Sequence, residues 1–167
     1  MTNYGRILKE KERDNPNAIC RATYLFSNVG EMLKCYGRTL RFPNDKNLYL
    51  AEMKLAMGDI IIQCRLIEEE NSYGHYIIKM NKIVAPEYVI ARIATLAGLI
   101  VKHLVQGVKW RLATDGENFT TNQIVIRLLN KCGELCAWLD WDVDEIEHIG
   151  FLHTCERYEQ FEREGWH

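Results

Sequence analysis

The sequence has few residues that break regular structure and no long hydrophobic run. Its 167 residues include only three prolines and eleven glycines, which excludes a fold dominated by loops. No apolar stretch approaches the roughly 20 residues needed to span a bilayer, and the polar residues 1–16 lack the apolar centre of a signal peptide. We therefore expect a soluble, cytoplasmic protein without a membrane partner.

An excess of charge of one sign is also absent. The 21 Lys and Arg residues nearly balance the 23 Asp and Glu residues, giving a net charge of −2. A broad basic face for extended nucleic-acid binding is therefore not expected. Apolar residues make up 47% of the chain and charged residues 26%, which is typical of a globular protein. We predict a single domain over residues 1–167.

Several common catalytic signatures are missing. The sequence contains no Gly-x-x-x-x-Gly-Lys, Gly-x-Gly-x-x-Gly or Gly-x-Ser-x-Gly pattern, so P-loop, Rossmann and nucleophile-elbow chemistry have no support. The six cysteines lie within apolar periodic segments, where reduced core residues are expected. Cys132 and Cys136 are spaced unlike a typical zinc-binding pair.

What the sequence does contain is helical periodicity. Apolar residues recur every three to four positions, and strict alternation is almost absent. This pattern predicts an all-α fold, a bundle of four to five long helices. Helix-start signals occur at Asn15-Pro16, at Thr120 or Thr121, and at Asp142. The segment His75–Val84 is compatible with a short strand or a helical turn. The expected helices span about 16–40, 47–69, 86–110, 120–140 and 142–164.

Similar short motifs recur along the chain and suggest an internal duplication of a helical hairpin. Gly30, Lys34 and Phe42 match Gly98, Lys102 and Trp110 at a constant offset of 68, and Gly58-Asp59 matches Gly133-Glu134 at an offset of 75. Chance similarity between two amphipathic helices is the alternative. Under the duplication, the halves cover about 16–72 and 86–141, and a C-terminal helix covers 142–164.

Three carboxylates on the first predicted hairpin are candidate metal ligands. Glu52 and Asp59 are seven residues apart, which places them two turns apart on nearly the same helix face. Glu31 lies on the preceding helix, which a hairpin brings opposite that face. Carboxylates from facing helices hold hard cations such as Mg²⁺. The alternative is that all three lie on solvated helix faces.

Basic residues accompany these acids. Lys34 and Arg38 follow Glu31 on the same helix, Arg41 ends that helix, and Arg65 follows Asp59 on the next one. Phosphate groups are recognised by such cations. The alternative for each is surface pairing three or four residues away, such as Glu31 with Lys34. The sequence thus favours a phosphate-bearing ligand, with Lys34, Arg38 and Arg41 as its binding residues.

The segment Val29-Gly30-Glu31-Met32-Leu33-Lys34, followed by Glu52–Gln63 with its Met57-Gly58-Asp59 step, resembles the MazG-like all-α nucleoside triphosphate pyrophosphohydrolases. The resemblance covers about residues 22–70. It implies a helical unit that holds Mg²⁺ on acids and splits a nucleoside or deoxynucleoside triphosphate into a monophosphate and pyrophosphate. It implies catalytic roles for Glu31 and Asp59, with Glu52 as a further metal ligand.

The chain departs from the family motifs at two places. Only the last of three expected glutamates is present, as Glu31, and Ala56 stands where the second helix usually has its first acid. The alternative function is therefore a helical binding or assembly module that kept the fold and lost catalysis, and a homodimer is open in either case. For the enzyme, Glu31 and Asp59 should face each other, and Asp59→Asn should stabilise the metal-free protein by relieving their repulsion.

Overall fold

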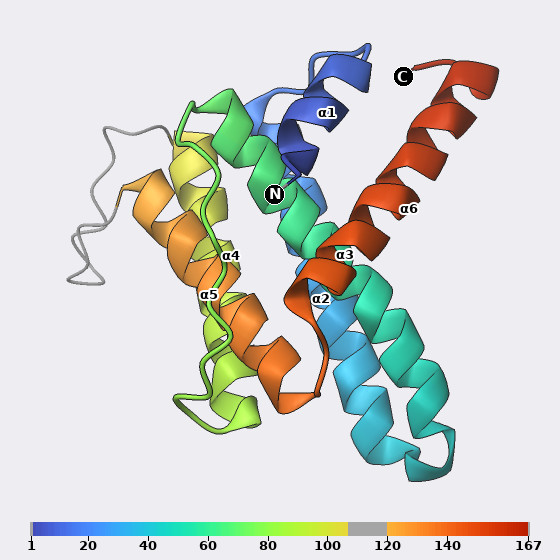
Figure 1. Ribbon diagram of the computed structural model, residues 1–167, viewed down its shortest axis with the longest axis vertical. Coiled ribbons are helices and arrows are strands. Elements are labelled where there is room, and N and C mark those ends of the chain that lie inside the picture. The colour runs from blue at the N-terminus through green and yellow to red at the C-terminus, as the bar shows by residue number, and fades with distance from the viewer. Residues whose placement is uncertain (1, 107–119, 167) are drawn as a thin grey trace.

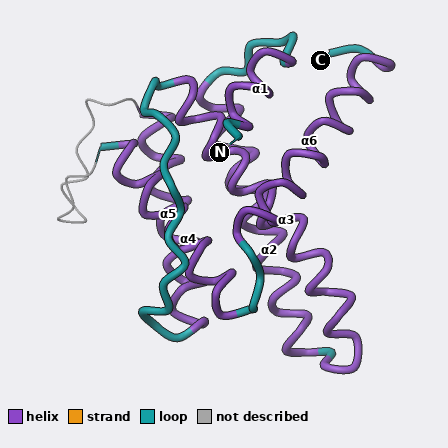
Figure 2. The backbone as a smooth tube through the Cα atoms, in the orientation of Figure 1, coloured by secondary structure: helices purple, strands orange, loops and turns teal. Residues whose placement is uncertain are grey.

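The computed structural model describes residues 2–106 and 120–166, and every regular element within them is a helix (Figures 1 and 2). The all-α prediction is therefore confirmed for this part of the chain. The elements are α1 (Tyr4–Lys11), α2 (Ala18–Arg41), the 3₁₀ turn η1 (Pro43–Asp45), α3 (Lys46–Glu70), α4 (Pro86–Gln106), α5 (Thr121–Trp138) and α6 (Val143–Glu164).

Capping side chains fix several of the helix starts. Thr120 and Gln123 form a capping box at α5, and the Asp142 side chain accepts a hydrogen bond from the Asp144 backbone at α6. The predicted α2 start at Asn15-Pro16 is wrong by two residues, because the Asn17 side chain caps the helix by accepting from the Cys20 backbone N–H. The expected helix end near Trp110, and with it the match of Phe42 to Trp110, lies outside the described residues.

Two segments differ from the sequence expectation. Helix α1 was not predicted; its start is capped by Asn3, and buried Leu8 anchors it against Ile62 and Leu66 of α3. His75–Val84 forms neither a short strand nor a helical turn; it belongs to an irregular connection, residues 71–85, that runs alongside α5 (Figure 2). Polar side chains of α3 and α5 accept hydrogen bonds from its backbone.

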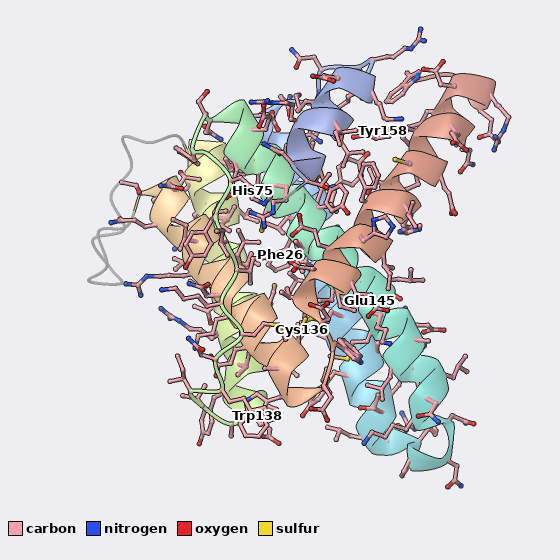
Figure 3. All side chains as sticks on the ribbon, in the orientation of Figure 1. Phe26, His75, Cys136, Trp138, Glu145 and Tyr158 are labelled. Atoms are coloured by element: carbon pink, nitrogen blue, oxygen red, sulfur yellow. The ribbon has the colours of Figure 1, made fainter. Side chains whose placement is uncertain are left out.

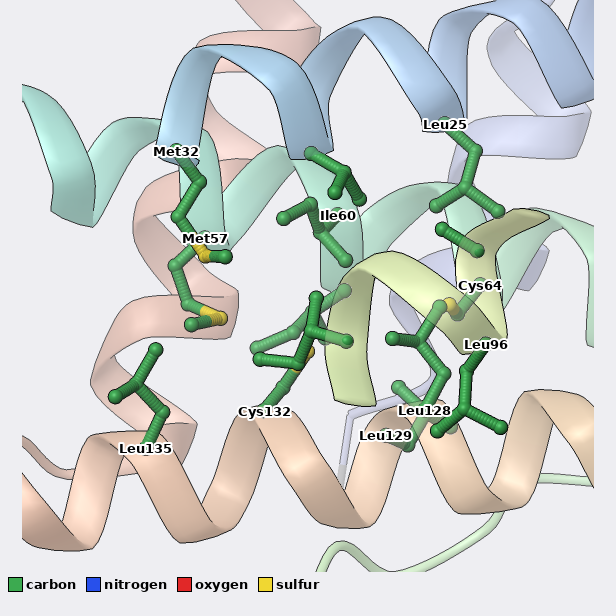
Figure 4. Close-up of a cluster of buried hydrophobic side chains, with 14 of the residues drawn as sticks. Leu25, Met32, Met57, Ile60, Cys64, Leu96, Leu128, Leu129, Cys132 and Leu135 are labelled. Carbon is green, nitrogen blue, oxygen red and sulfur yellow. The ribbon is translucent and has the colours of Figure 1, made fainter. Parts of the chain in front are cut away.

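Two helical hairpins pack together around the main core. Helix α2 contacts α3 and α4, and α5 contacts α4 and α3, so the four helices form a bundle. Leu25, Met32, Ile60, Leu96 and Leu128 are among the fully buried side chains at its centre (Figure 4). On α2 the buried face runs through Leu25, while its neighbour Phe26 and the earlier Ile19 face outward.

Helix α4 is the described helix that is long and apolar enough to cross a membrane. Its segment Pro86–Val105 has a mean hydropathy of 1.6, and 44% of the apolar window is buried inside the protein. Arg92 and Lys102 interrupt its apolar residues, so the sequence shows no continuous apolar run of that length. A core helix meets the same criterion, and Ile93, Leu96 and Ile100 of α4 belong to the core of the bundle.

Helix α6 crosses α3 at a point where two glycines meet (Figure 1). A Cβ atom added at Gly58 would lie 2.8 Å from both the Gly150 nitrogen and the Ile146 carbonyl oxygen. Only the absence of side chains at both positions lets the two backbones approach this closely. The Gly58 position therefore fixes where α6 lies on the bundle.

In the second hairpin, the matching pair Gly133-Glu134 of α5 is likewise covered by the 71–85 connection. A Cβ at Gly133 would collide with the Lys79 carbonyl, and Glu134 accepts hydrogen bonds from the Ile83 and Val84 backbone N–H groups. In both hairpins, then, a glycine admits a covering segment and the following acid binds it. The internal duplication itself stays a prediction.

A buried ion cluster joins the N-terminal segment to the rest of the protein. Arg21 of α2 donates to Glu12 at 2.6 Å and to Glu70 of α3 at 2.6 Å, and the Tyr158 hydroxyl of α6 donates to Glu12 at 2.8 Å. Burial alone would raise the pKa of Glu12, but the hydrogen bonds from Arg21, Lys9 and Tyr158 and the charge of Arg21 lower it below its usual 4.5. Glu12 thus binds side chains of α1, α2 and α6, and Arg21 extends the cluster to α3 through Glu70.

The glycine crossing predicts opposite effects for two alanine substitutions. Gly58→Ala should lower the free energy of unfolding by about 1–3 kcal/mol, because the new methyl group meets backbone atoms that cannot move aside independently. Gly30→Ala is the matched control on α2, where an added Cβ has nothing within 4 Å; it should raise stability by about 0.5–1 kcal/mol. Urea unfolding of both variants measures this, and equal effects would contradict the crossing.

The ion cluster predicts a pH-dependent effect of Glu12→Gln. Because the pKa of Glu12 is lower in the folded state than in the unfolded state, its stabilising contribution is present above the ordinary carboxyl pKa and is lost as the pH falls through the folded value. The variant should be clearly less stable than wild type at neutral pH, and the difference should shrink toward about pH 3. Urea unfolding across that range, with exposed Glu10→Gln as control, tests this; a constant difference would refute it.

Candidate functional site

The α2–α3 hairpin brings two of the three predicted metal ligands together. One carboxylate oxygen each of Glu31 and Glu52 and the Cys35 sulfur lie within 4.8 Å of one another. The Cys35 thiol donates to Glu52 at 3.7 Å. Burial raises the pKa of this thiol, and the charges of the two glutamates raise it further. The thiol is therefore neutral at pH 7, and the two carboxylates are the groups suited to a hard cation.

The predicted substrate-binding cations lie around this site but have close neighbours of their own. Lys34 pairs with Glu31 at 3.0 Å, three residues away on α2, with both side chains about half exposed. The Arg38 guanidinium lies over the Tyr49 ring, and that of Arg41 lies over the Phe42 ring. All three remain on the exposed end of the hairpin, where a phosphate could reach them.

Asp59 does not belong to this cluster, so the expectation that it faces Glu31 is wrong. Its carboxylate binds His153 of α6, with Nδ1 at 3.0 and 3.1 Å from the two oxygens, and lies 3.9 Å from Arg157. Only 9% of the Asp59 side chain is exposed. Two helical turns separate it from Glu52 by about 10 Å along the axis, and the Gly58 crossing places α6 over it.

Arg65, the remaining candidate cation, has a structural role. Its guanidinium donates to Glu147 at 3.0 and 3.1 Å, to Glu68 at 2.9 Å and to the Tyr76 carbonyl at 2.7 Å. Both the arginine and the two glutamates are buried. Through these hydrogen bonds Arg65 holds α6 and the 71–85 connection against α3. Its guanidinium is therefore not available to a phosphate.

Comparison with known proteins does not identify a family for this chain. No protein-family model, curated protein or solved structure matches the chain. The MazG-like resemblance therefore depends on the two motif segments of α2 and α3 alone.

The contacts of Asp59 reverse the expected effect of removing its charge. Asp59→Asn weakens the hydrogen bond to His153 and the attraction to Arg157 without relieving any repulsion, so it should lower the free energy of unfolding by about 1–2 kcal/mol. Asp45→Asn is the matched control, because Asp45 is exposed and its side chain does not cap α3; it should change stability by less than about 0.5 kcal/mol. An increase in stability for Asp59→Asn would contradict this role and would indicate that Asp59 is repelled by another carboxylate.

Proposed function

We propose that the protein is a MazG-like, Mg²⁺-dependent nucleotide pyrophosphohydrolase whose active site lies at the α2–α3 hairpin. The observation that supports this is the convergence of the Glu31 and Glu52 carboxylates from facing helices. A divalent cation would be held by these two side chains; Asp59, bound to α6, is not among its ligands. The substrate is a nucleoside or deoxynucleoside triphosphate, and the protein acts in the cytoplasm.

The side chains around the acids fit a triphosphate. Mg²⁺ usually takes one or two carboxylates and completes its shell with water and substrate phosphates, and when bound it supplies charge neutralisation and an activated water. Lys34, Arg38 and Arg41 extend from the acids to the end of the hairpin and would neutralise phosphate oxygens. Lys34 would exchange its pairing with Glu31 for the phosphate, since the cation neutralises that glutamate.

A second candidate is a helical binding module without catalysis. The contacts of Asp59 favour it. Asp59 is the acid of α3 that matches the family motif, and here it binds His153 of α6. Ala56, buried in the core, also supplies no carboxylate where the family has one. In this case the hairpin would bind a Mg²⁺–nucleotide without splitting it.

Glu31→Gln and Glu52→Gln separate these functions. The wild-type protein should release pyrophosphate from at least one nucleoside triphosphate in the presence of Mg²⁺. Each substitution should reduce the rate at least about tenfold, since loss of even an outer partner of a metal ligand costs that much. Glu10→Gln, at an exposed glutamate of α1, should leave the rate unchanged.

Melting temperatures recorded in the same series identify the binding module. A Mg²⁺–nucleotide that binds the folded protein must raise its melting temperature by mass action. A rise that both glutamine variants abolish, without pyrophosphate release from wild type, favours the binding module. If wild type shows neither release nor a rise, both functions fail.

A further inference from the structure

A cavity separate from the acidic hairpin lies between the N-terminal segment, α2 and α6. Its volume is about 230 Å³, and residues 12–16, the first half of α2 and the second half of α6 form its walls. Gln63 of α3 also lines it. Gln63 is eleven residues from Glu52, or about 16 Å along the helix axis, so the cavity is distinct from the proposed hydrolase site.

Gln63 lines this cavity, and one of its hydrogen-bonding atoms has no partner among the described residues. The residue is 4% exposed, and its Oε1 atom is buried without a hydrogen-bond partner among the described residues. A buried acceptor that lacks a donor costs free energy, so such groups are rare in folded proteins. A ligand with an N–H group in the cavity would supply the missing donor.

Aromatic rings form much of the cavity wall. Tyr24, Tyr158, Phe161 and Trp166 all line it. The Trp166 ring lies 5.2 Å from that of Tyr158 and 5.3 Å from that of Phe161, and its indole N–H donates to Glu162 at 3.0 Å. Tyr158, which Figure 3 shows between α1 and α6, is fixed by its hydrogen bond to Glu12. These rings offer a positioned surface on which a flat ligand can stack.

The charges that line the cavity cancel. Glu12 and Asp14 contribute two negative charges, and Arg21 and Arg157 contribute two positive ones. Glu12 and Arg21 are bound to each other, and Arg157 lies 3.9 Å from Asp59. The cavity therefore favours a neutral ligand over an anion such as a triphosphate.

We propose that this cavity binds a nucleobase, either free or as part of an uncharged nucleoside. Its volume is just below the roughly 300 Å³ at which pockets for drug-sized ligands begin, which suits a single heteroaromatic ring system. The ring stacks on the aromatic wall, and an N–H group on its edge donates to Gln63 Oε1. Glutamine pairs with base edges in this way when it recognises adenine. This binding requires neither Mg²⁺ nor the acids of the α2–α3 hairpin.

Isothermal titration calorimetry of the full chain without Mg²⁺ tests the proposal, with adenosine, guanosine, cytidine, uridine, thymidine and the free bases as probes. At least one probe should bind with a Kd below about 1 mM. Gln63→Met, of similar volume, should weaken that binding at least about tenfold, because the N–H of the ligand loses its acceptor. The same variant should melt at a higher temperature than wild type, because it removes a buried polar group without a partner.

Two further variants complete the experiment. Tyr24→Ala removes a stacking ring that is half exposed, so the protein should fold normally and bind the probe at least about fivefold more weakly. Gln160→Met, at an exposed glutamine of α6 that does not line the cavity, should bind like wild type. The proposal is overturned if no probe binds wild type below about 1 mM, or if Gln63→Met and Tyr24→Ala both bind as tightly as wild type.

Discussion

The burial of α3 on every side is the constraint from which the rest of the arrangement follows. All residues from Ala56 to Glu68 are buried, and α3 contacts α1, α2, α5 and α6. A helix in this position is normally apolar all round, yet α3 carries Asp59, Gln63, Arg65 and Glu68 within the buried stretch. Asp59, Arg65 and Glu68 obtain hydrogen-bond partners from the elements that cover the helix.

Buried polar groups therefore determine how the covering elements are placed. Asp59 binds His153 of α6, and Arg65 binds Glu147 of α6 and the Tyr76 carbonyl of the 71–85 connection. Burial raises the pKa of Glu68 even though Arg65 lowers it in part, so that carboxylate is stabilised less completely than a surface one. Gln63 is the exception on this helix, since its oxygen has no partner within the described chain.

Local features of the sequence predicted the long helices α2 to α6 but not α1, because periodicity and capping act over a few residues. They also placed Glu31 on the helix opposite Glu52 and Asp59, but the prediction that Glu31 faces Asp59 was wrong, since the Glu31 carboxylate lies near that of Glu52. They could not predict the partner of Asp59, because His153 follows it by 94 residues and reaches it only through the Gly58–Gly150 crossing. Local features also could not predict which of the adjacent apolar residues Leu25 and Phe26 is buried, because tertiary packing buries only Leu25.

The irregular connection between the two hairpins is held by hydrogen bonds from its backbone to helix side chains. Backbone N–H groups of Tyr76, Lys79 and Val84 donate to the side chains of Glu68, Asn130 and Glu134, respectively, and the Trp138 indole donates to the Val84 carbonyl. A β-strand obtains such partners from the backbone of its neighbour, whereas here helix side chains supply them. The pairing register of residues 76–84 is thus encoded in the identities of four side chains, and a single substitution on α5 can release a stretch of chain that no β-sheet would lose so easily.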